Sequence, residues 1–275
     1  MKLFISVDME GISGVTDWDD VDKGTSDYDY FRTLMTDDVN AAIEGALEAG
    51  VTEVVVNDSH DTMRNLIVDR LHPKAEVIRG FVKPLLMMEG IDESFDMAFF
   101  IGYHCMAGTD QAILNHTLNN KAVQRITING REIGEAGINA AIAGAFGVPV
   151  VLVTGDSQTA TEVKHEIEGV HTVAVKQAIG MFTARCLHPS VSQQMIREKA
   201  IEAVRNRQQV KPVKALDHYE IDMEFKYTSS AHLVSFLPGM TLVGGRTIRF
   251  HTDDIRKAMP VLLAILLLGD VKELS

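Results

Sequence analysis

Over the first 180 residues, short continuous runs of hydrophobic residues alternate with longer stretches of helical period. The short runs are rich in Val, Ile, Leu and Phe, as expected of strands covered on both faces. Such alternation is typical of an α/β fold, a largely parallel sheet with flanking helices. The predicted strands are residues 3–7, 53–57, 76–78, 97–103, 125–128, 148–154 and 172–176.

The clearest predicted helix covers residues 28–49, where apolar side chains recur every three or four positions and Gly50 follows as a stop. Residues 138–146 and 162–167 show a similar pattern.

The pattern changes after about residue 180. A helix over 190–207, with Ser190 as its N-cap, precedes two strand-like runs at 220–227 and 241–250. Asp253 or Asp254 would cap a last helix that contains the apolar run 261–268. We therefore expect an α/β metal-binding domain over residues 1–185 and a smaller C-terminal α+β unit over residues 186–275.

Charge and cysteine content restrict the function. The 275 residues include 26 basic and 38 acidic side chains, a net charge of −12, without a basic stripe, so we expect no nucleic-acid partner. Two cysteines, Cys105 and Cys186, fit a reducing compartment. The N-terminal apolar run is too short for a secretory signal, and no run approaches the roughly 20 residues that span a bilayer. We expect a cytoplasmic protein without a membrane partner.

Two carboxylates follow the first predicted strand. Side chains two positions apart in extended chain point the same way, so Asp8 and Glu10 present their charges to one side of the strand end. Like charges this close need a cation or a shared proton. An isolated Asp-x-Glu is more often a pair of solvated turn acids, so the remaining residues of the chain decide between the two.

Further polar groups follow other predicted strands, and carboxyl ends of parallel strands gather at one sheet edge. His60 follows the second strand, His104 follows the fourth, and Glu135 begins a helix after the strand at 125–128. Each histidine alone would usually be structural. Together with Asp8 and Glu10 they form the mixed nitrogen and oxygen set that zinc prefers. Five such groups exceed the three protein ligands of a mononuclear catalytic zinc, so we expect two metals with Asp8 as the bridge.

His116 lies in a polar segment between His104 and the next strand, where a loop could hold it over the metals. Cys105 would point away from this site, which favours a buried thiol over a nucleophile. The chain lacks a dinucleotide-binding glycine motif, a Walker-type phosphate loop and a Gly-x-Ser-x-Gly elbow, which argues against nucleotide binding and serine hydrolysis.

Several separated motifs of the chain resemble the zinc-dependent D-aminopeptidases of bacterial dipeptide-transport operons. The resemblance spans nearly the whole chain and includes two motifs without obvious chemistry, at residues 71–73 and 82–84. The motifs that carry it are Ser6-Val7-Asp8-Met9-Glu10-Gly11-Ile12-Ser13-Gly14, Val56-Asn57-Asp58-Ser59-His60, Gly102-Tyr103-His104, Asn115-His116 and Gly134-Glu135-x-Gly137.

The resemblance implies a metalloaminopeptidase with two zinc ions per subunit, in which Asp8 bridges them. It places Glu10 and His104 on one zinc, His60 and Glu135 on the other, and makes His116 the catalytic residue. The family labels that histidine a nucleophile; its chemistry favours a general acid or base, or a donor to the oxyanion, with a zinc-activated water as the attacking group.

The implied reaction removes an N-terminal D-residue from a short peptide or an amino-acid amide. The resemblance also suggests a homo-oligomer, with a ring-shaped decamer as one form of it.

Two alternatives stay open from the sequence. One keeps the metals and changes the substrate, giving a dizinc amidase or phosphoesterase for another small molecule. The other is a non-catalytic, metal-stabilised protein that binds peptides.

Overall fold

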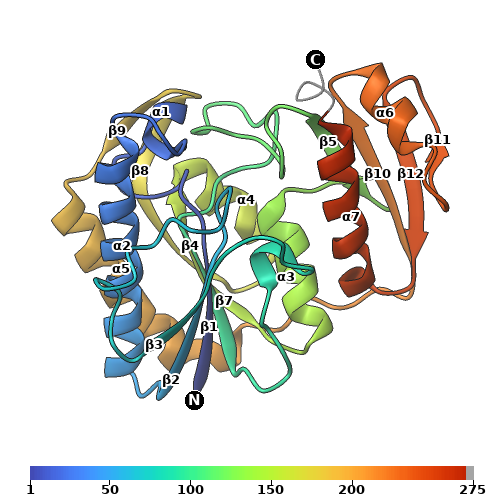
Figure 1. Ribbon diagram of the computed structural model, residues 1–275. Helices are drawn as coiled ribbons and strands as arrows, with labels where there is room; N and C mark the ends of the chain where they lie inside the picture. The colour runs from blue at the N-terminus through green and yellow to red at the C-terminus, as the bar shows by residue number, and fades with distance from the viewer. Residues whose placement is uncertain (271–275) are drawn as a thin grey trace.

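The computed structural model describes residues 1–270, and their strands form two sheets (Figure 1). The larger, sheet A, has the strand order β3-β2-β1-β4-β7-β8-β9, with all neighbours parallel except the edge pair β8 and β9. Its strands are β1 (Lys2–Val7), β2 (Glu53–Asp58), β3 (Ala75–Ile78), β4 (Met97–Ile101), β7 (Val150–Asp156), β8 (His171–Gly180) and β9 (Thr183–Cys186).

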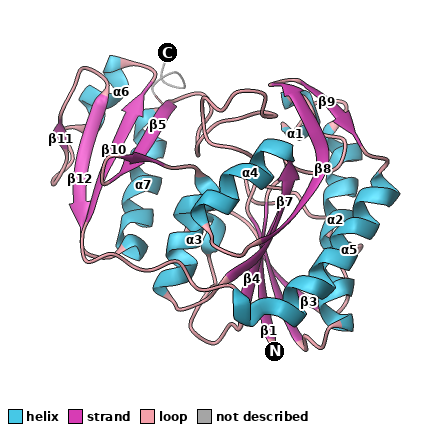
Figure 2. Ribbon diagram, turned by 180° about the vertical axis from the view of Figure 1, so that it is seen from behind, coloured by secondary structure: helices cyan, strands magenta, loops and turns pink. Residues whose placement is uncertain are grey.

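Helices cover both faces of sheet A, which explains the continuous apolar runs of its central strands. Figures 1 and 2 show α2 and α5 on one face and α3 and α4 on the other. These helices are α2 (Tyr28–Glu48), α3 (Glu135–Ala145), α4 (Ser157–Glu166) and α5 (Pro189–Asn206), with the short elements α1 (Trp18–Val21), η1 (Leu86–Met88) and η2 (Arg207–Gln209) in connecting segments.

The smaller sheet B is antiparallel, in the order β11-β12-β10-β5-β6. Helix α7 packs between this sheet and α3, so it links the two halves of the molecule (Figure 1). The elements are β5 (Val123–Ile128), β6 (Arg131–Glu132), β10 (Tyr219–Phe225), β11 (Thr241–Leu242), β12 (Thr247–Thr252), α6 (Thr228–Val234) and α7 (Ile255–Gly269). Within residues 1–270, no helix has both the length and the apolar content needed to cross a membrane.

The sequence predicted the α/β class correctly, but one strand was placed in the wrong sheet. The run 125–128 was expected in the parallel sheet, whereas it lies in β5 and pairs antiparallel with β10. Val123, Ile126 and Ile128 are buried while Gln124 and Arg125 are exposed, because only one face of this strand is covered. The run 241–250 is likewise two short strands, since residues 243–246 form the turn that joins β11 to β12.

The expected cap of the helix at 190–207 was also wrong by two residues. His188 is the N-cap of α5, accepting a hydrogen bond from the backbone N–H of Ser190, and Pro189 takes the first helical position. Asp254, one of the two residues expected to cap the last helix, is the N-cap of α7. The domain division at residue 185 stays a prediction; β5 and β6 precede it but belong to sheet B, and α5 follows it but packs on α2.

The strand order places a switch point at the centre of sheet A. From β1 the chain moves outward through β2 and β3, then returns to build β4 on the other side of β1. Ligands of open α/β sheets bind beyond the carboxyl ends of strands at such a reversal. The segments that follow β1, β2 and β4 therefore meet at one place.

Candidate metal centre

Three neighbouring strand ends bring the expected residues together. Asp8 and Glu10 follow β1, His60 follows β2 and His104 follows β4. His60 Nδ1 lies 3.3 Å from Asp8 Oδ1 and 3.1 Å from Glu10 Oε2, while His104 Nε2 lies 3.3 Å from Asp8 Oδ2. Asp8 thus stands between the two histidines because β1 stands between β2 and β4.

Glu135 reaches the same cluster by a different route from the one expected. It is the first residue of α3, which follows the β5–β6 hairpin of sheet B rather than a strand of sheet A. Its Oε1 lies 3.3 Å from His104 Nε2 and accepts a hydrogen bond of 2.6 Å from the backbone N–H of Leu118. The N-terminal end of a helix also favours a negative side chain.

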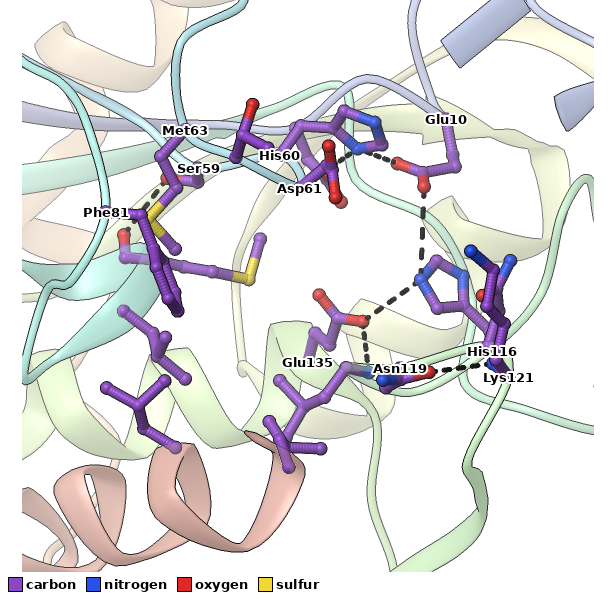
Figure 3. Close-up of a pocket in the computed structure, with 18 of the residues that line it drawn as sticks. Glu10, Ser59, His60, Asp61, Met63, Phe81, His116, Asn119, Lys121 and Glu135 are labelled. Atoms are coloured by element: carbon purple, nitrogen blue, oxygen red, sulfur yellow. Dashed lines mark hydrogen bonds and ion pairs between the residues drawn. The ribbon is translucent and has the colours of Figure 1, made fainter. Parts of the chain in front are cut away.

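His116 lies over the cluster, as expected, in the segment between β4 and β5. Its ring stacks on that of His104 with centroids 4.1 Å apart, and the indole of Trp18 meets it edge-on at 5.5 Å. His116 Nε2 lies 3.7 Å from Glu135 Oε1 and 3.9 Å from Glu10 Oε1. The structure therefore gathers all six residues proposed from the sequence into one centre. Figure 3 shows four of them, Glu10, His60, His116 and Glu135, around the cavity.

The three histidines are oriented by backbone carbonyls. His60 Nε2 donates to the Val21 carbonyl at 3.1 Å, His104 Nδ1 to that of Cys105 at 2.9 Å, and His116 Nδ1 to that of Leu114 at 2.9 Å. A ring nitrogen that donates in this way leaves the other nitrogen with its lone pair free to bind a metal. In each case that free nitrogen faces the carboxylates.

The three carboxylates of the cluster carry negative charge that metal cations would balance. Burial raises the pKa of Asp8, Glu10 and Glu135, yet the adjacent histidines outweigh it and hold each pKa below its usual value, so all three carboxylates stay ionised. Asp8 Oδ2 and His104 Nε2 are buried and have no hydrogen-bond partner, although they lie 3.3 Å apart. The neighbouring carboxylates raise the pKa of His104, so Nε2 carries a proton until a metal ion displaces it. The two atoms then fit a metal ion placed between them.

The ligand atoms fall into overlapping groups around Asp8. One contains Asp8, Glu10 and His60, and another contains Asp8, His104 and Glu135, with the atoms of each group within 4.8 Å of one another. A third group of the same size joins Glu10, His104 and His116. The short contacts thus associate Glu10 with His60, whereas the family resemblance implied a zinc shared by Glu10 and His104.

The loop that carries Glu10 is fixed by a close backbone approach. The Gly11 N–H donates to the Gly102 carbonyl at 2.8 Å, and a Cβ on Gly11 would lie 2.0 Å from the Tyr103 carbonyl oxygen. Only glycine fits there. The contact ties the segment after β1 to the segment after β4, and so ties Glu10 to His104.

A buried lysine holds the same loop from the opposite side. Lys176, on β8, is 1% exposed, and its ammonium donates to the backbone carbonyls of Glu10 at 2.6 Å, Ile12 at 2.9 Å and Val15 at 2.7 Å. Sequence reasoning placed Lys176 at the end of a strand and gave it no role. The signal was present, because a lysine in an apolar strand of a parallel sheet has to find buried acceptors.

Some polar residues near the centre have structural roles instead. Asp58 accepts hydrogen bonds from the backbone of Asn65 and Leu66, and Asp156 caps α4. The Cys105 thiol is buried, as expected, and burial raises its pKa, which keeps it protonated and unreactive.

Comparisons with known proteins now bear on this geometry. The family model of the D-aminopeptidases, peptidase family M55, matches residues 1–264. This chain belongs to that family. It is 40% identical over 266 residues to a D-aminopeptidase of Bacillus subtilis strain 168, covering 96% of each chain. A solved structure of a Bacillus subtilis protein, the Zn-dependent D-aminopeptidase DppA, described as a self-compartmentalizing protease, matches with a TM-score of 0.95, 40% identity and 98% of each chain covered.

Membership in the D-aminopeptidase family agrees with the chemistry of the centre. The family resemblance noted in the sequence is confirmed. A zinc-dependent relative of the same fold fits a cluster of carboxylates and carbonyl-anchored histidines with two unpartnered buried atoms. Neither the phosphoesterase nor the non-catalytic alternative finds support in these relatives.

Proposed function

We propose that this protein is a zinc-dependent aminopeptidase that releases an N-terminal D-residue from short peptides or amino-acid amides. The observation that carries the proposal is the convergence of Asp8, Glu10, His60, His104 and Glu135 at the switch point of sheet A. The preference for a D-residue rests on the family and its relatives.

In the proposed centre, Asp8, Glu10 and His60 hold one zinc, and Asp8, His104 and Glu135 hold the other. The short distances within these two groups support this pairing. When bound, such a metal pair supplies a Lewis acid for the scissile carbonyl and makes water acidic enough to attack near neutral pH. The carboxylates balance the positive charge, and the backbone carbonyls hold the imidazole rings in place.

His116 is the proposed catalytic residue, acting in proton transfer. Burial lowers its pKa and neighbouring His104 lowers it further, so the ring is neutral at pH 7. Because Nδ1 donates to Leu114, Nε2 has a free lone pair directed at the cluster. Nε2 can therefore accept the proton of the attacking water and return it to the departing amine. Trp18 and the stacked ring of His104 limit its rotation.

Hydrolysis of alanine amide tests the reaction. The zinc-loaded protein is expected to hydrolyse D-alanine amide, to act much more slowly on L-alanine amide, and to leave a phosphoester untouched. Removal of zinc with a chelator should abolish the activity, and added zinc should restore it. Full activity in a protein without zinc, confirmed by elemental analysis, would refute the proposal.

The role of His116 is tested by His116→Gln. We expect kcat to fall by about 10²- to 10⁴-fold because the proton carrier is lost. Zinc content should be unchanged because His116 is not among the proposed ligands. Lys164→Gln, an exposed change on α4, serves as the control. A variant with zinc content unchanged and near-normal kcat would exclude His116 from proton transfer.

We also propose a ring-shaped homo-oligomer, such as a decamer, in the cytoplasm. The self-compartmentalizing relative supports the assembly, and two unpaired cysteines support a reducing location. Light scattering coupled to gel filtration measures the mass, and a monomer at micromolar concentration would contradict the ring.

A further inference from the structure

The metal centre opens into a cavity of about 740 Å³ whose opposite wall is apolar. Figure 3 shows Phe81 and Met63 on the side of this cavity away from His116 and Lys121. The wall comes from two segments far apart in the sequence, the stretch between β2 and η1 with η1 itself, and helix α7. Its apolar residues are Met63, Phe81, Leu86, Met87, Leu263, Leu266 and Leu267.

Two of these side chains are unusually exposed for their size. Phe81 is 46% exposed and Leu267 is 59% exposed, yet both line the cavity. Leu263, one helical turn before Leu267, is buried beneath it. Large apolar side chains grouped at a concave surface mark a place where an apolar ligand group binds.

A smaller cavity of about 290 Å³ adjoins the other side of His116. Trp18, His116 and Lys121 line both cavities, so the two lie on either side of the catalytic histidine. The described residues that line the smaller cavity include Lys121 and Lys226 and no acidic side chain. Besides the proposed ligands, the larger cavity is lined by three carboxylates, those of Asp22, Asp61 and Asp270, and by two cations, Arg64 and the shared Lys121.

This charge difference gives a bound peptide one direction. The amino group is favoured in the larger, acidic cavity, and the free carboxylate is favoured beside Lys121 and Lys226 in the smaller one. The bond to be cut then lies next to His116, between the two cavities. In this direction the apolar wall faces the side chain of the amino-terminal residue.

We propose that the wall formed by Phe81, Met63, Leu263 and Leu267 is the subsite for that side chain, which makes the preferred substrates short peptides with a large apolar amino-terminal residue. This inference rests on the aminopeptidase function and names its substrate class. Removing apolar area from water stabilises such a substrate, whereas a charged side chain would be desolvated against these four residues, none of which can pair with its charge.

A panel of D-amino-acid amides tests the subsite in the zinc-loaded protein. We expect kcat/KM for D-leucine amide to exceed that for D-aspartate amide or D-lysine amide by about 100-fold, and that for D-alanine amide by about 10-fold. None of these amides has a C-terminal carboxylate, so the comparison isolates the side-chain subsite from the contact of that group with the two lysines.

Two pairs of exposed residues provide matched variants that leave the core intact. Phe81→Ser and Leu267→Ser should each lower kcat/KM for D-leucine amide by about 10-fold and change that for D-alanine amide by less than about 2-fold. The controls are Val82→Ser, 64% exposed, and Leu268→Ser, 42% exposed, which are adjacent in sequence but do not line the cavity. They should leave both values, and the zinc content, unchanged.

The outcomes separate this inference from the function on which it rests. Equal kcat/KM for charged and apolar amides, or equal effects of the lining and control variants, would overturn the subsite while the aminopeptidase stands. Hydrolysis of none of the amides by a protein with full zinc content would overturn the proposed function and the subsite with it.

Discussion

Replacing Lys176 with methionine removes a cation that contacts no substrate and yet should disturb the metal centre. The side chain keeps most of its length and apolar area, so the change isolates the ammonium. Three backbone carbonyls of the Glu10 loop then lose their shared donor in a place that water does not reach. Each unsatisfied buried carbonyl costs about 1–3 kcal/mol.

The loss is partly offset by the charge that is no longer buried. Burial lowers the pKa of Lys176 from 10.5 to about 8, so holding its ammonium charged inside the protein costs about 3 kcal/mol relative to water. The Ile12 carbonyl still accepts from the Val15 N–H, so the carbonyls of Glu10 and Val15 are the two left without a donor. Two carbonyls at roughly 2 kcal/mol each, less this amount, leave a net destabilisation of about 1 kcal/mol. The loop that positions Glu10 should bear most of it.

Urea unfolding of the metal-free protein and zinc titration measure the two consequences separately. Lys176→Met should lower the free energy of unfolding by about 1 kcal/mol and weaken zinc binding at least about 10-fold. Lys164→Met, exposed on α4, should change the free energy of unfolding by less than about 0.5 kcal/mol. A Lys176→Met protein with normal stability and normal zinc affinity would refute the view that this lysine holds the loop in place.

Further predictions concern the same loop. Asp38 accepts hydrogen bonds from the backbone N–H and the hydroxyl of Ser13, and burial raises its pKa from 3.8 to about 6. Between these values the folded protein binds more protons than the unfolded chain, so wild-type stability should fall by about 2 kcal/mol as pH rises from 4 to 7 through this group. Urea unfolding across that range should show this component missing in Asp38→Asn, and parallel curves for the two proteins would contradict it. Gly11→Ala should cost at least about 3 kcal/mol, because the added carbon would lie 2.0 Å from the Tyr103 carbonyl oxygen. Gly180→Ala, with no atom near the added carbon, should be close to neutral in the same urea unfolding assay.

Much of sheet A could be predicted because its central strands are buried on both faces. β1 and β4 therefore appear as continuous apolar runs, whatever their neighbours are. The run at β5 is similar in composition, but its partner β10 lies about ninety residues later in the chain. Local pattern does not contain that pairing, and so the strand was placed in the wrong sheet.

The candidate site was predictable to the extent that it depends on strand ends. Asp8, His60 and His104 each follow a strand, and parallel strands bring their carboxyl ends together. Lys176 could not be linked to Glu10 in advance, because its acceptors are backbone carbonyls whose position depends on the complete strand order. The apolar wall at Leu267 could not be predicted either. The helical period indicates that α7 has an apolar face, but it does not show that part of this face lines a cavity.

Zinc stoichiometry tests most directly the central claim that Asp8 is shared by two metal ions. Elemental analysis of the purified, zinc-saturated protein should give about two zinc ions per chain. Asp8→Asn should retain fewer than one, because the shared carboxylate is lost from both groups, whereas Asp61→Asn, a change of an exposed cavity residue next to His60, should retain two. Two zinc ions bound to Asp8→Asn with wild-type affinity would contradict the account.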